Sequence, residues 1–215
     1  MKIVAVSDLH GYLPPVPPCD LLLLAGDLCP RKEHREAAQA EWLDTHFRRW
    51  LEQAPARQIV GVAGNHDFIF QTRRDLVPAG LPWTYLQDSG TTWEGLNLWG
   101  SPWQPWFFDW AFNLYEPDLV KKWALIPAGT DVLLLHGPPF GYGDGAYRGS
   151  DPVEHTGSPG LLDRIRQVAP RLVVFGHIHE GRGQWQLGPT VLANVSVVNE
   201  RYELTHPPWE FELTR

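Results

Sequence analysis

Short apolar runs rich in Val, Ile and Leu recur along the chain, and each is bounded by residues that favour turns. Five of these runs lie at Lys2–Val6, 21–25, 58–63, Val132–Leu135 and Leu172–Phe175. Continuous apolar runs of this length are typical of strands that are buried on both faces. The pattern therefore predicts sheets whose strands lie inside the molecule.

Helical periodicity appears between the runs. In residues 31–54 the large apolar side chains recur on one helical face. They are Trp42, Leu43, Phe47, Trp50, Leu51 and Ala54. A second helix is predicted to begin with Ser158 as its N-cap and Pro159 at its first position, and to stop at Pro170. Strands that alternate with helices indicate an α/β fold with parallel pairing.

The end of the chain differs, because residues 191–198 and 202–213 are expected to form late strands with antiparallel pairing. The sequence contains no internal repeat, low-complexity segment or linker. A chain of 215 residues suits one domain with a sizeable core, so residues 1–215 are predicted to form a single domain. The 20 Gly and 20 Pro residues favour a loop-rich α/β fold over a helical bundle.

Charge and cysteine content narrow the functional classes. The 18 basic and 25 acidic residues give a net charge of −7, which argues against a long nucleic acid as partner. Cys19 and Cys29 are too few for a disulfide framework and are expected to be structural thiols in a reducing compartment. No apolar stretch approaches the ~18 residues that span a membrane, and no signal peptide is evident. These features predict a cytoplasmic protein without a membrane segment.

Residues that commonly ligate metals follow the apolar runs or end them. The clusters are Ser7-Asp8-Leu9-His10, Gly26-Asp27, Gly64-Asn65-His66-Asp67, His136-Gly137 and Gly176-His177-Ile178-His179. In open α/β sheets, ligands bind beyond the carboxyl ends of the strands, which is where all five clusters fall. In an extended segment, residues i and i+2 point the same way. Asp8 and His10 can therefore hold one ion together, and so can His177 and His179.

Each cluster alone has an ordinary explanation. A lone Asp-x-His is mostly a surface coincidence, Gly-Asp after a strand is commonly a turn, and His136 alone would be a hydrogen-bonded histidine at a strand end. Five clusters at strand ends in this order favour a metal site. Seven side chains then suffice for two ions, with Asp27 shared and Asn65 offering a neutral oxygen. The seven are Asp8, His10, Asp27, Asn65, His136, His177 and His179.

In this order the motifs resemble those of the calcineurin-like metallophosphoesterase superfamily over nearly the whole chain. Segments 99–106, 136–139 and 175–181 are also similar to a branch shared with the animal brain metallophosphoesterase-domain proteins. The resemblance implies a four-layer α/β/β/α sandwich of two mixed sheets, with both metals at the strand ends. That branch is associated with hydrolysis of cyclic-nucleotide phosphodiesters. Asp67 stands where Glu is expected in the animal branch, which leaves the identity of the substrate open.

The resemblance also assigns the ligands to two ions. It implies Asp8, His10, Asp27 and His179 around one ion, and Asp27, Asn65, His136 and His177 around the other. Imidazole and carboxylate ligands without thiolate favour Mn, Fe, Zn or Ni over Mg or Ca, and Mn or Fe is expected first. Asn65 and His66 are expected to contact substrate. His66 would protonate or stabilise the leaving alkoxide, with Asp67 orienting it, unless His66 merely packs the loop.

These residues predict a two-metal phosphoesterase that cleaves phosphodiesters, either small or cyclic nucleotides, by attack of a metal-bridging hydroxide. A phosphomonoesterase or broad-specificity phosphatase is the alternative enzyme. A non-catalytic metal-binding scaffold is the alternative of another class, but all seven ligands are present. The sequence leaves the physiological ester, the native metal and the oligomeric state open.

Two other segments are candidates for shaping a substrate pocket. Seven of the eleven tryptophans lie in residues 83–123, where Trp103, Trp106 and Trp110 are spaced for a shared helical face. Such aromatic side chains are either core or a rim on which a nucleobase stacks.

The Gly-rich segment 141–149 contains Tyr142, Tyr147 and Arg148. It is either a mobile flap over the phosphate or a solvated loop. His155, a further imidazole nearby, receives no role from the sequence.

Overall fold

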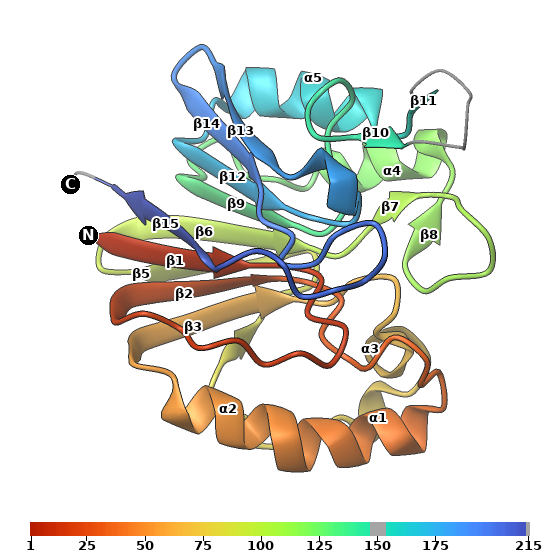
Figure 1. Ribbon diagram of the computed structural model, residues 1–215. Helices are drawn as coiled ribbons and strands as arrows, with labels where there is room; N and C mark the ends of the chain where they lie inside the picture. Colours follow the sequence, from red (N-terminus) through yellow and green to blue (C-terminus); the bar gives the residue numbers. More distant parts are fainter. Residues whose placement is uncertain (147–153, 214–215) are drawn as a thin grey trace.

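Two sheets lie face to face at the centre of the protein (Figure 1). The structure is a computed structural model and describes residues 1–146 and 154–213. The first sheet has the order β15-β1-β2-β3-β4. Its strands are β1 Lys2–Val6, β2 Cys19–Ala25, β3 Ala56–Val62, β4 Thr84–Tyr85 and β15 Trp209–Glu212. Strands β1 to β4 pair in parallel, whereas β15 runs antiparallel to β1.

The second sheet has the order β13-β14-β12-β9-β6-β5. Its strands are β5 Ser89–Trp93, β6 Leu96–Ser101, β9 Val132–Leu135, β12 Leu172–Phe175, β13 Gly183–Leu187 and β14 Thr190–Asn194. The four central strands pair in parallel and the two edge strands are antiparallel. Two short pairs lie outside the sheets: β7 Gln104–Pro105 with β8 Asn113–Leu114, and β10 Gly145–Ala146 with β11 Glu154–His155.

Helices cover the outer face of each sheet. The first sheet is covered by α1 Glu36–Trp42, a π-helical turn at Leu43–Phe47, α2 Arg48–Gln53 and α3 Phe68–Thr72. The second is covered by α4 Glu116–Trp123 and α5 Pro159–Val168. Short 3-10 helices lie at Arg74–Leu76 and His179–Gly181. Figure 1 shows the resulting helix, sheet, sheet and helix layers, so the predicted α/β sandwich of two mixed sheets is confirmed.

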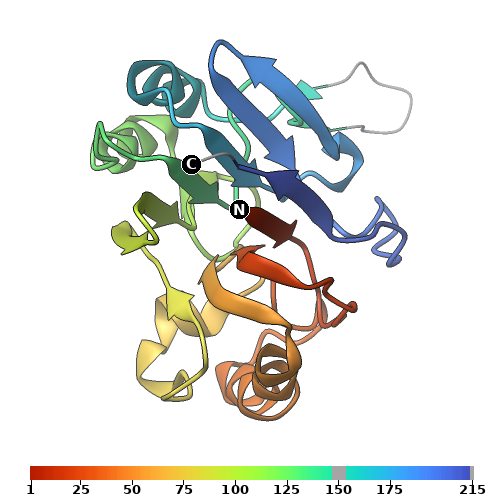
Figure 2. The same cartoon turned by 90° about the vertical axis from the view of Figure 1, so that its left-hand side faces the viewer.

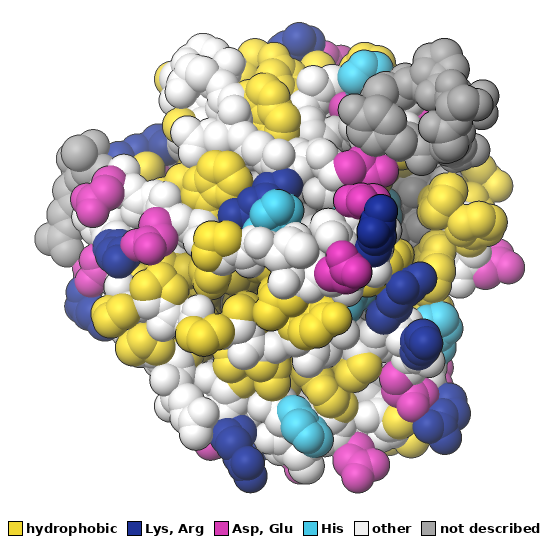
Figure 3. All heavy atoms as spheres, viewed as in Figure 1, with side chains coloured by type: hydrophobic (Ala, Val, Ile, Leu, Met, Phe, Trp, Pro, Cys, Tyr) yellow, Lys and Arg dark blue, Asp and Glu magenta, His cyan; other side chains and the backbone are white. Residues whose placement is uncertain are grey.

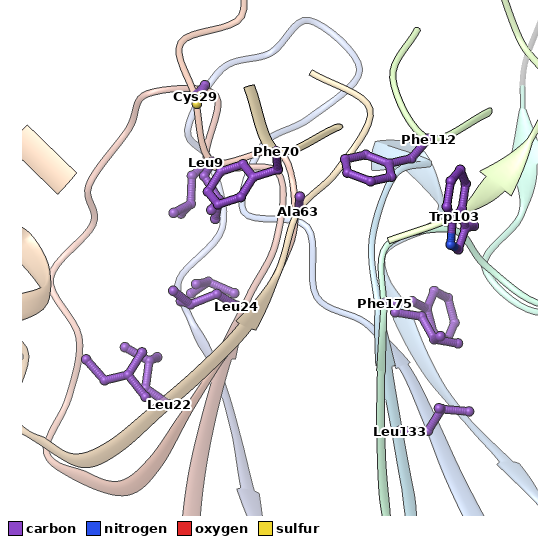
Figure 4. Close-up of a cluster of buried hydrophobic side chains, with 14 of the residues drawn as sticks. Leu9, Leu22, Leu24, Cys29, Ala63, Phe70, Trp103, Phe112, Leu133 and Phe175 are labelled. Atoms are coloured by element: carbon purple, nitrogen blue, oxygen red, sulfur yellow. The ribbon is translucent and has the colours of Figure 1, made fainter. Parts of the chain in front are cut away.

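Alternating side chains of the strands fill two cores, one between the two sheets and one between the sheets and the helices. In β1, Ile3 and Ala5 face the core between the sheets, while Val4 and Val6 belong to the cluster that reaches the helices. Figure 4 shows this outer packing on both sides, with Leu22 and Leu24 in one group and Leu133 and Phe175 in the other. Because both faces of the central strands are covered, their sequences are continuously apolar.

The chain ends meet at one edge of the sheets (Figures 1 and 2). The amino group of Met1 donates to the carbonyl of Leu213 at 3.1 Å, beside the paired strands β1 and β15. The carboxyl ends of β1, β2 and β3 point away from the termini, and motifs with predicted metal ligands follow them.

Both helices predicted in the sequence are present. The helical segment starts at Glu36, later than the predicted residue 31, and Leu43, Phe47, Trp50 and Leu51 are buried on the predicted face. In α5 the Ser158 hydroxyl accepts a hydrogen bond from the Leu161 amide at 3.1 Å, as an N-cap does.

One expectation about an element is wrong, and another holds only in part. The segment 103–110 contains β7 followed by a loop rather than a helix, so its tryptophans do not share a helical face. The late strand β14 pairs antiparallel with β13, as predicted, but on its other side it pairs in parallel with β12. Strand β15 is antiparallel as predicted, but it starts only at Trp209.

Both cysteines, Cys19 and Cys29, are buried free thiols, as the sequence predicted. Among the helices of the described residues, none is both long enough and apolar enough to cross a membrane.

Candidate metal centre

The loops that follow β1, β2, β3, β9 and β12 meet at one end of the two sheets. These loops carry all seven predicted ligands, and the structure brings the seven together. Six of the seven residues are buried and His177 is half-buried. The seven are Asp8, His10, Asp27, Asn65, His136, His177 and His179. The parallel arrangement places these strand ends side by side, so residues far apart in sequence converge.

Asp8, His10 and His179 form one group. The Nε2 atoms of His10 and His179 lie 3.2 Å apart, and Asp8 Oδ1 is 3.6 Å from His179 Nε2. One donor atom from each of the three residues lies within 4.8 Å of the others. A carboxylate and two imidazoles at this separation match the ligand set of a transition-metal ion.

Asn65, His136 and His177 form a second group. The Oδ1 atom of Asn65 is 2.8 Å from His136 Nε2 and 2.7 Å from His177 Nδ1. A neutral oxygen and two ring nitrogens therefore converge from three different loops.

Asp27 lies between the two groups. Its Oδ2 is 3.6 Å from His10 Nε2 in the first group, and its Oδ1 is 3.5 Å from His136 Nε2 in the second. The two oxygens of one carboxylate thus face different groups. This arrangement allows Asp27 to bridge two cations.

Hydrogen bonds outside the centre orient its rings. The Nδ1 atom of His136 lies 2.9 Å from the carbonyl of Ala25, and the Nδ1 atom of His179 lies 3.1 Å from the carbonyl of Asn199. A carbonyl accepts only from a protonated nitrogen, so both rings carry their proton on Nδ1 and turn the Nε2 lone pair inward. The amide of His177 donates to both oxygens of Asp8 at 3.1 Å.

Four of the seven residues adopt a left-handed backbone conformation. Their φ angles are 58° for Asp8, 45° for His10, 54° for Asp27 and 70° for His177. Residues other than Gly pay a free-energy cost for this conformation, which persists where the surrounding structure enforces it and clusters at functional sites.

Close approach of the loops also requires glycine. A Cβ atom on Gly64 would lie 2.3 Å from Asp27 Oδ1, and one on Gly176 would lie 2.4 Å from Asp8 Oδ2. Both distances are far below van der Waals contact. The glycines of the sequence motifs are therefore needed to let one loop pass beside the carboxylate of another.

The charges of the centre fit divalent cations. Burial, together with the carboxylates of Asp67 and Asp8, raises the pKa of Asp27 well above its ordinary value. Burial lowers the pKa of both His10 and His177, so these rings are neutral and present lone pairs. Buried carboxylates that face inward lone pairs are stabilised by a positive charge between them. The donor set therefore fits two metal ions.

His66 and Asp67 lie next to the ligands. The His66 Nε2 is 3.9 Å from Asp27 Oδ2, and its buried Nδ1 has no hydrogen-bond partner among the described residues. Burial, followed by the charge of His136, lowers the pKa of His66 to about 3. The carboxylate of Asp67 accepts hydrogen bonds from the amides of Leu28, Cys29 and Gly64 at 2.8–3.1 Å. Asp67 thus joins the loop after β3 to the loop after β2.

A cavity of about 520 Å³ opens beside the ligands. Its lining includes Asp27, Asn65, His66, His177 and His179. Aromatic side chains from the loop after β7 also line it, namely Trp106, Phe107, Phe108 and Trp110. Trp106 and Phe108 are 48% and 69% exposed, so these two rings are not core residues. The cavity therefore lies between predicted metal ligands and an aromatic wall.

Trp103, Trp106 and Trp110 differ in their surroundings, since one is buried and two line the cavity. Trp103 is buried and donates to the carboxylate of Asp88 at 2.9 Å, so it is a core residue. Trp106 and Trp110 line the cavity, as a rim would. The ring centroid of Trp110 lies 4.2 Å from that of His66.

The Gly-rich segment 141–149 is only partly described, since Tyr147 and Arg148 lie outside the described residues. Tyr142 packs on Trp185, with ring centroids 6.4 Å apart. His155 Nδ1 lies 2.9 Å from a carboxylate oxygen of Asp144, so His155 contacts an acid rather than the metal centre.

Sequence reasoning missed two residues near the cavity. Tyr202 lines it and contacts the rings of His10 and His179, and Arg31 lies over the Tyr202 ring. Both belong to loops without a recognisable motif, so the sequence contains no signal that identifies them.

Known proteins resemble this chain in sequence and in fold. The model of the calcineurin-like phosphoesterase family matches residues 1–181. Metallophosphoesterase domain-containing protein 1 from Homo sapiens and from Mus musculus is in each case 35% identical, over 99% of this chain and 71% of the relative. UPF0046 protein T07D4.2 from Caenorhabditis elegans is 30% identical, over 99% of this chain and 60% of the relative. A solved crystal structure superimposes on this chain with a TM-score of 0.57 and 15% sequence identity. The match covers 90% of this chain and 89% of the chain in that structure, and it supports the fold.

Proposed function

The chain belongs to the calcineurin-like phosphoesterase family, and from this premise we propose that it hydrolyses phosphodiesters with two divalent transition-metal ions. The carboxylate of Asp27 carries the proposal, because its two oxygens face two separate groups of metal ligands. Small or cyclic nucleotides are the proposed substrates.

We assign the ligands by their grouping in the structure. One ion would be held by Asp8, His10, Asp27 and His179, and the other by Asp27, Asn65, His136 and His177. Nitrogen and oxygen ligands without thiolate favour Mn or Fe, with Zn or Ni as alternatives. When bound, such a pair of ions polarises the phosphoryl group and lowers the pKa of a water.

His66 is the proposed group that acts on the leaving oxygen. It lines the cavity at the edge of the metal centre, and its Nδ1 is free of partners among the described residues. With its pKa lowered to about 3 by burial, the ring is neutral near pH 7. It would then stabilise the leaving alkoxide as a hydrogen-bond donor, with Asn65 beside it at the substrate.

Asp67 has a positioning role in this proposal. Its carboxylate holds the backbone of Gly64, Leu28 and Cys29, so it fixes the loop of His66 against the loop of Asp27. Asp67 would therefore orient His66 through the backbone rather than through the ring.

The aromatic wall supports a substrate with a planar substituent. Trp106 and Phe108 are large exposed apolar side chains on the cavity, and such rings stack on nucleobases without sequence preference. The net charge of −7 argues against a long polyanion. A small nucleotide ester satisfies both constraints.

Phosphomonoesterase activity is the alternative, because the same ions bind a monoester equally well. Protein stripped of metal and reconstituted with Mn²⁺ separates the two when it is offered bis-p-nitrophenyl phosphate, p-nitrophenyl phosphate and 2′,3′- and 3′,5′-cyclic nucleotides. We expect faster turnover of the diesters. Preference for the monoester would favour the alternative, and no turnover with both metal sites filled would leave a binding scaffold.

A further inference from the structure

Tyr202 lies beside the candidate metal centre and contacts two of its predicted ligands. Its ring centroid lies 4.8 Å from that of His10 and 4.7 Å from that of His179, and it lines the cavity that also contains His66. The ring therefore packs on two of the ligand residues and, at the same time, faces the space in which a substrate binds.

The backbone around Tyr202 is strained and strongly constrained. Tyr202 has a φ of 62°, a conformation that is costly for a bulky residue, and its amide donates to the carbonyl of Asn199 at 2.9 Å. The Asn199 side chain accepts hydrogen bonds from the amides of Arg201 and Glu203 at 2.9 and 3.0 Å. The same Asn199 carbonyl receives His179 Nδ1 at 3.1 Å. One turn thus orients a ligand and presents Tyr202 to the cavity.

Arg31 holds the face of the Tyr202 ring. Its guanidinium carbon lies 3.6 Å from the ring centroid, in cation–π contact, and Arg31 forms no ion pair with another described residue. Lys and Arg side chains lie at the right of the face shown in Figure 3, with Asp and Glu side chains among them, where Figure 1 places the loop after β14 and the segment before α1. The guanidinium of Arg31 therefore brings a positive charge to the ring of Tyr202, which lines the cavity.

The Tyr202 hydroxyl has no hydrogen-bond partner among the described residues, although its ring is half-buried. The carbonyl of Tyr202 does have one, since the hydroxyl of Tyr12 donates to it at 3.2 Å. A phenol is protonated at neutral pH and acts as a donor. At the wall of a cavity that would hold a phosphate ester, such a donor can bind an oxygen of the ester.

We propose that Tyr202 is a substrate-binding residue whose hydroxyl donates a hydrogen bond to an oxygen of the bound phosphate ester. Arg31 keeps the ring in place and adds positive charge beside the ester. The assignment rests on the proposed function, because it requires a phosphate group at the metal centre. Hydrogen bonds to a charged phosphate oxygen are stronger than those between neutral groups.

The test is Tyr202→Phe, which removes the hydroxyl and keeps the ring on His10 and His179. We expect Mn²⁺-reconstituted Tyr202→Phe to retain the wild-type metal content. Its kcat/KM for bis-p-nitrophenyl phosphate should fall about tenfold, and its affinity for inorganic phosphate in calorimetry should weaken by a similar factor. Tyr85→Phe is the matched control, because Tyr85, in β4, also loses a hydroxyl, which donates to Gln87, and does not line the cavity.

Calorimetry with phosphate separates this proposal from the proposed function. Weaker phosphate binding by Tyr202→Phe in a protein without turnover would refute the enzyme and leave the Tyr202 assignment standing. Wild-type phosphate affinity and wild-type rate in Tyr202→Phe would overturn the assignment. Loss of metal by Tyr202→Phe would also overturn it, because the hydroxyl would then serve the metal ligands.

Discussion

Asp27 is enclosed by protein, and the nearby carboxylates of Asp67 and Asp8 add to the cost of its charge. Its raised pKa means that, above the ordinary Asp pKa of about 4, the folded state binds more protons than the unfolded state, so stability falls as pH rises. At pH 7 the buried carboxylate of Asp27 therefore destabilises the metal-free protein. Bound cations remove this destabilisation, because they neutralise the same charge.

Asp27→Asn is therefore expected to raise the melting temperature of the metal-free protein at pH 7. The neutral amide keeps an oxygen that can accept from the His66 amide, as Asp27 Oδ1 does at 2.8 Å. The variant should also lose the increase in melting temperature that Mn²⁺ gives the wild type. Differential scanning fluorimetry with EDTA and with Mn²⁺ measures both effects, and a wild-type response of Asp27→Asn to Mn²⁺ would contradict a bridging role.

His66 makes stability depend on pH with the opposite sign. Burial lowers its folded-state pKa to about 3, whereas an unfolded His has a pKa of about 6.5, so the unfolded state binds more protons between these values. Stability is therefore lost as pH falls below about 6.5. In metal-free protein, the wild type should lose about 1–2 kcal/mol more than His66→Gln between pH 7.5 and pH 5.

Urea denaturation at the two pH values measures this loss. His46→Gln, at an exposed position of the π-helical turn, serves as the control and should follow the wild type. Parallel pH profiles for wild type and His66→Gln would show that the His66 ring is not held neutral.

The rate effect of His66 is a separate prediction. His66→Ala should retain both metal ions and lose about a hundredfold or more in kcat, because one hydrogen-bond donor to a developing oxyanion contributes about 10²–10³. Steady-state kinetics with an alkyl phosphodiester, together with elemental analysis for metal, measures the two quantities. A loss below about tenfold with full metal content would exclude the leaving-group role.

At the residue scale, the sequence predicted which seven side chains come together, because each stands in a short motif at a strand end. Tyr202 and Arg31 could not be predicted in this way. The contact of Arg31 with Tyr202, and that of Tyr202 with His10, depend on loops after β14 and β2 that meet only in the folded protein. The hydrogen bonds of Asp67 could not be predicted from the sequence either, because its partners are backbone amides, which every residue type except proline carries.

The strands carry the predicted ligands on loops that pass close to one another, and Gly64 lies where two of these loops meet. Its substitution by Ala would put a Cβ 2.3 Å from Asp27 Oδ1 and 2.4 Å from the Asp27 amide nitrogen. Gly64→Ala should therefore lose metal affinity by at least tenfold and destabilise the fold by about 2–4 kcal/mol. Gly129→Ala is the matched control, because no atom lies within 4 Å of a Cβ at that position.

Metal titration and urea denaturation of the two glycine variants test this prediction. Gly129→Ala should remain within about 0.5 kcal/mol of the wild type, as surface substitutions usually do. Wild-type metal affinity in Gly64→Ala would mean that the loops after β2 and β3 can separate without cost.

Element types could be predicted where the apolar periodicity was long, but not where they depend on pairing with another segment. The segment after residue 31 buries one helical face, and its apolar spacing revealed it. Trp103, Trp106 and Trp110 have helical spacing by coincidence, because Gln104 and Pro105 pair with β8 instead. The pairing of β14 with β12 depends on a partner about twenty residues earlier, which no local pattern specifies.

The whole molecule creates the site by packing two sheets. Asp8, Asp27 and Asn65 follow strands of the first sheet, while His136, His177 and His179 follow strands of the second. Neither sheet alone holds a complete ligand set for either proposed ion. Ion binding is therefore coupled to the packing of the two sheets and stabilises the folded chain by mass action.

Anomalous diffraction from crystals of the Mn²⁺-loaded protein tests the central claim most directly. Two manganese peaks are predicted about 3.5–4 Å apart, with Asp27 between them. One peak should contact Asp8, His10 and His179, and the other should contact Asn65, His136 and His177. A single peak at saturating Mn²⁺, or two peaks without a shared Asp27 carboxylate, would contradict the binuclear centre.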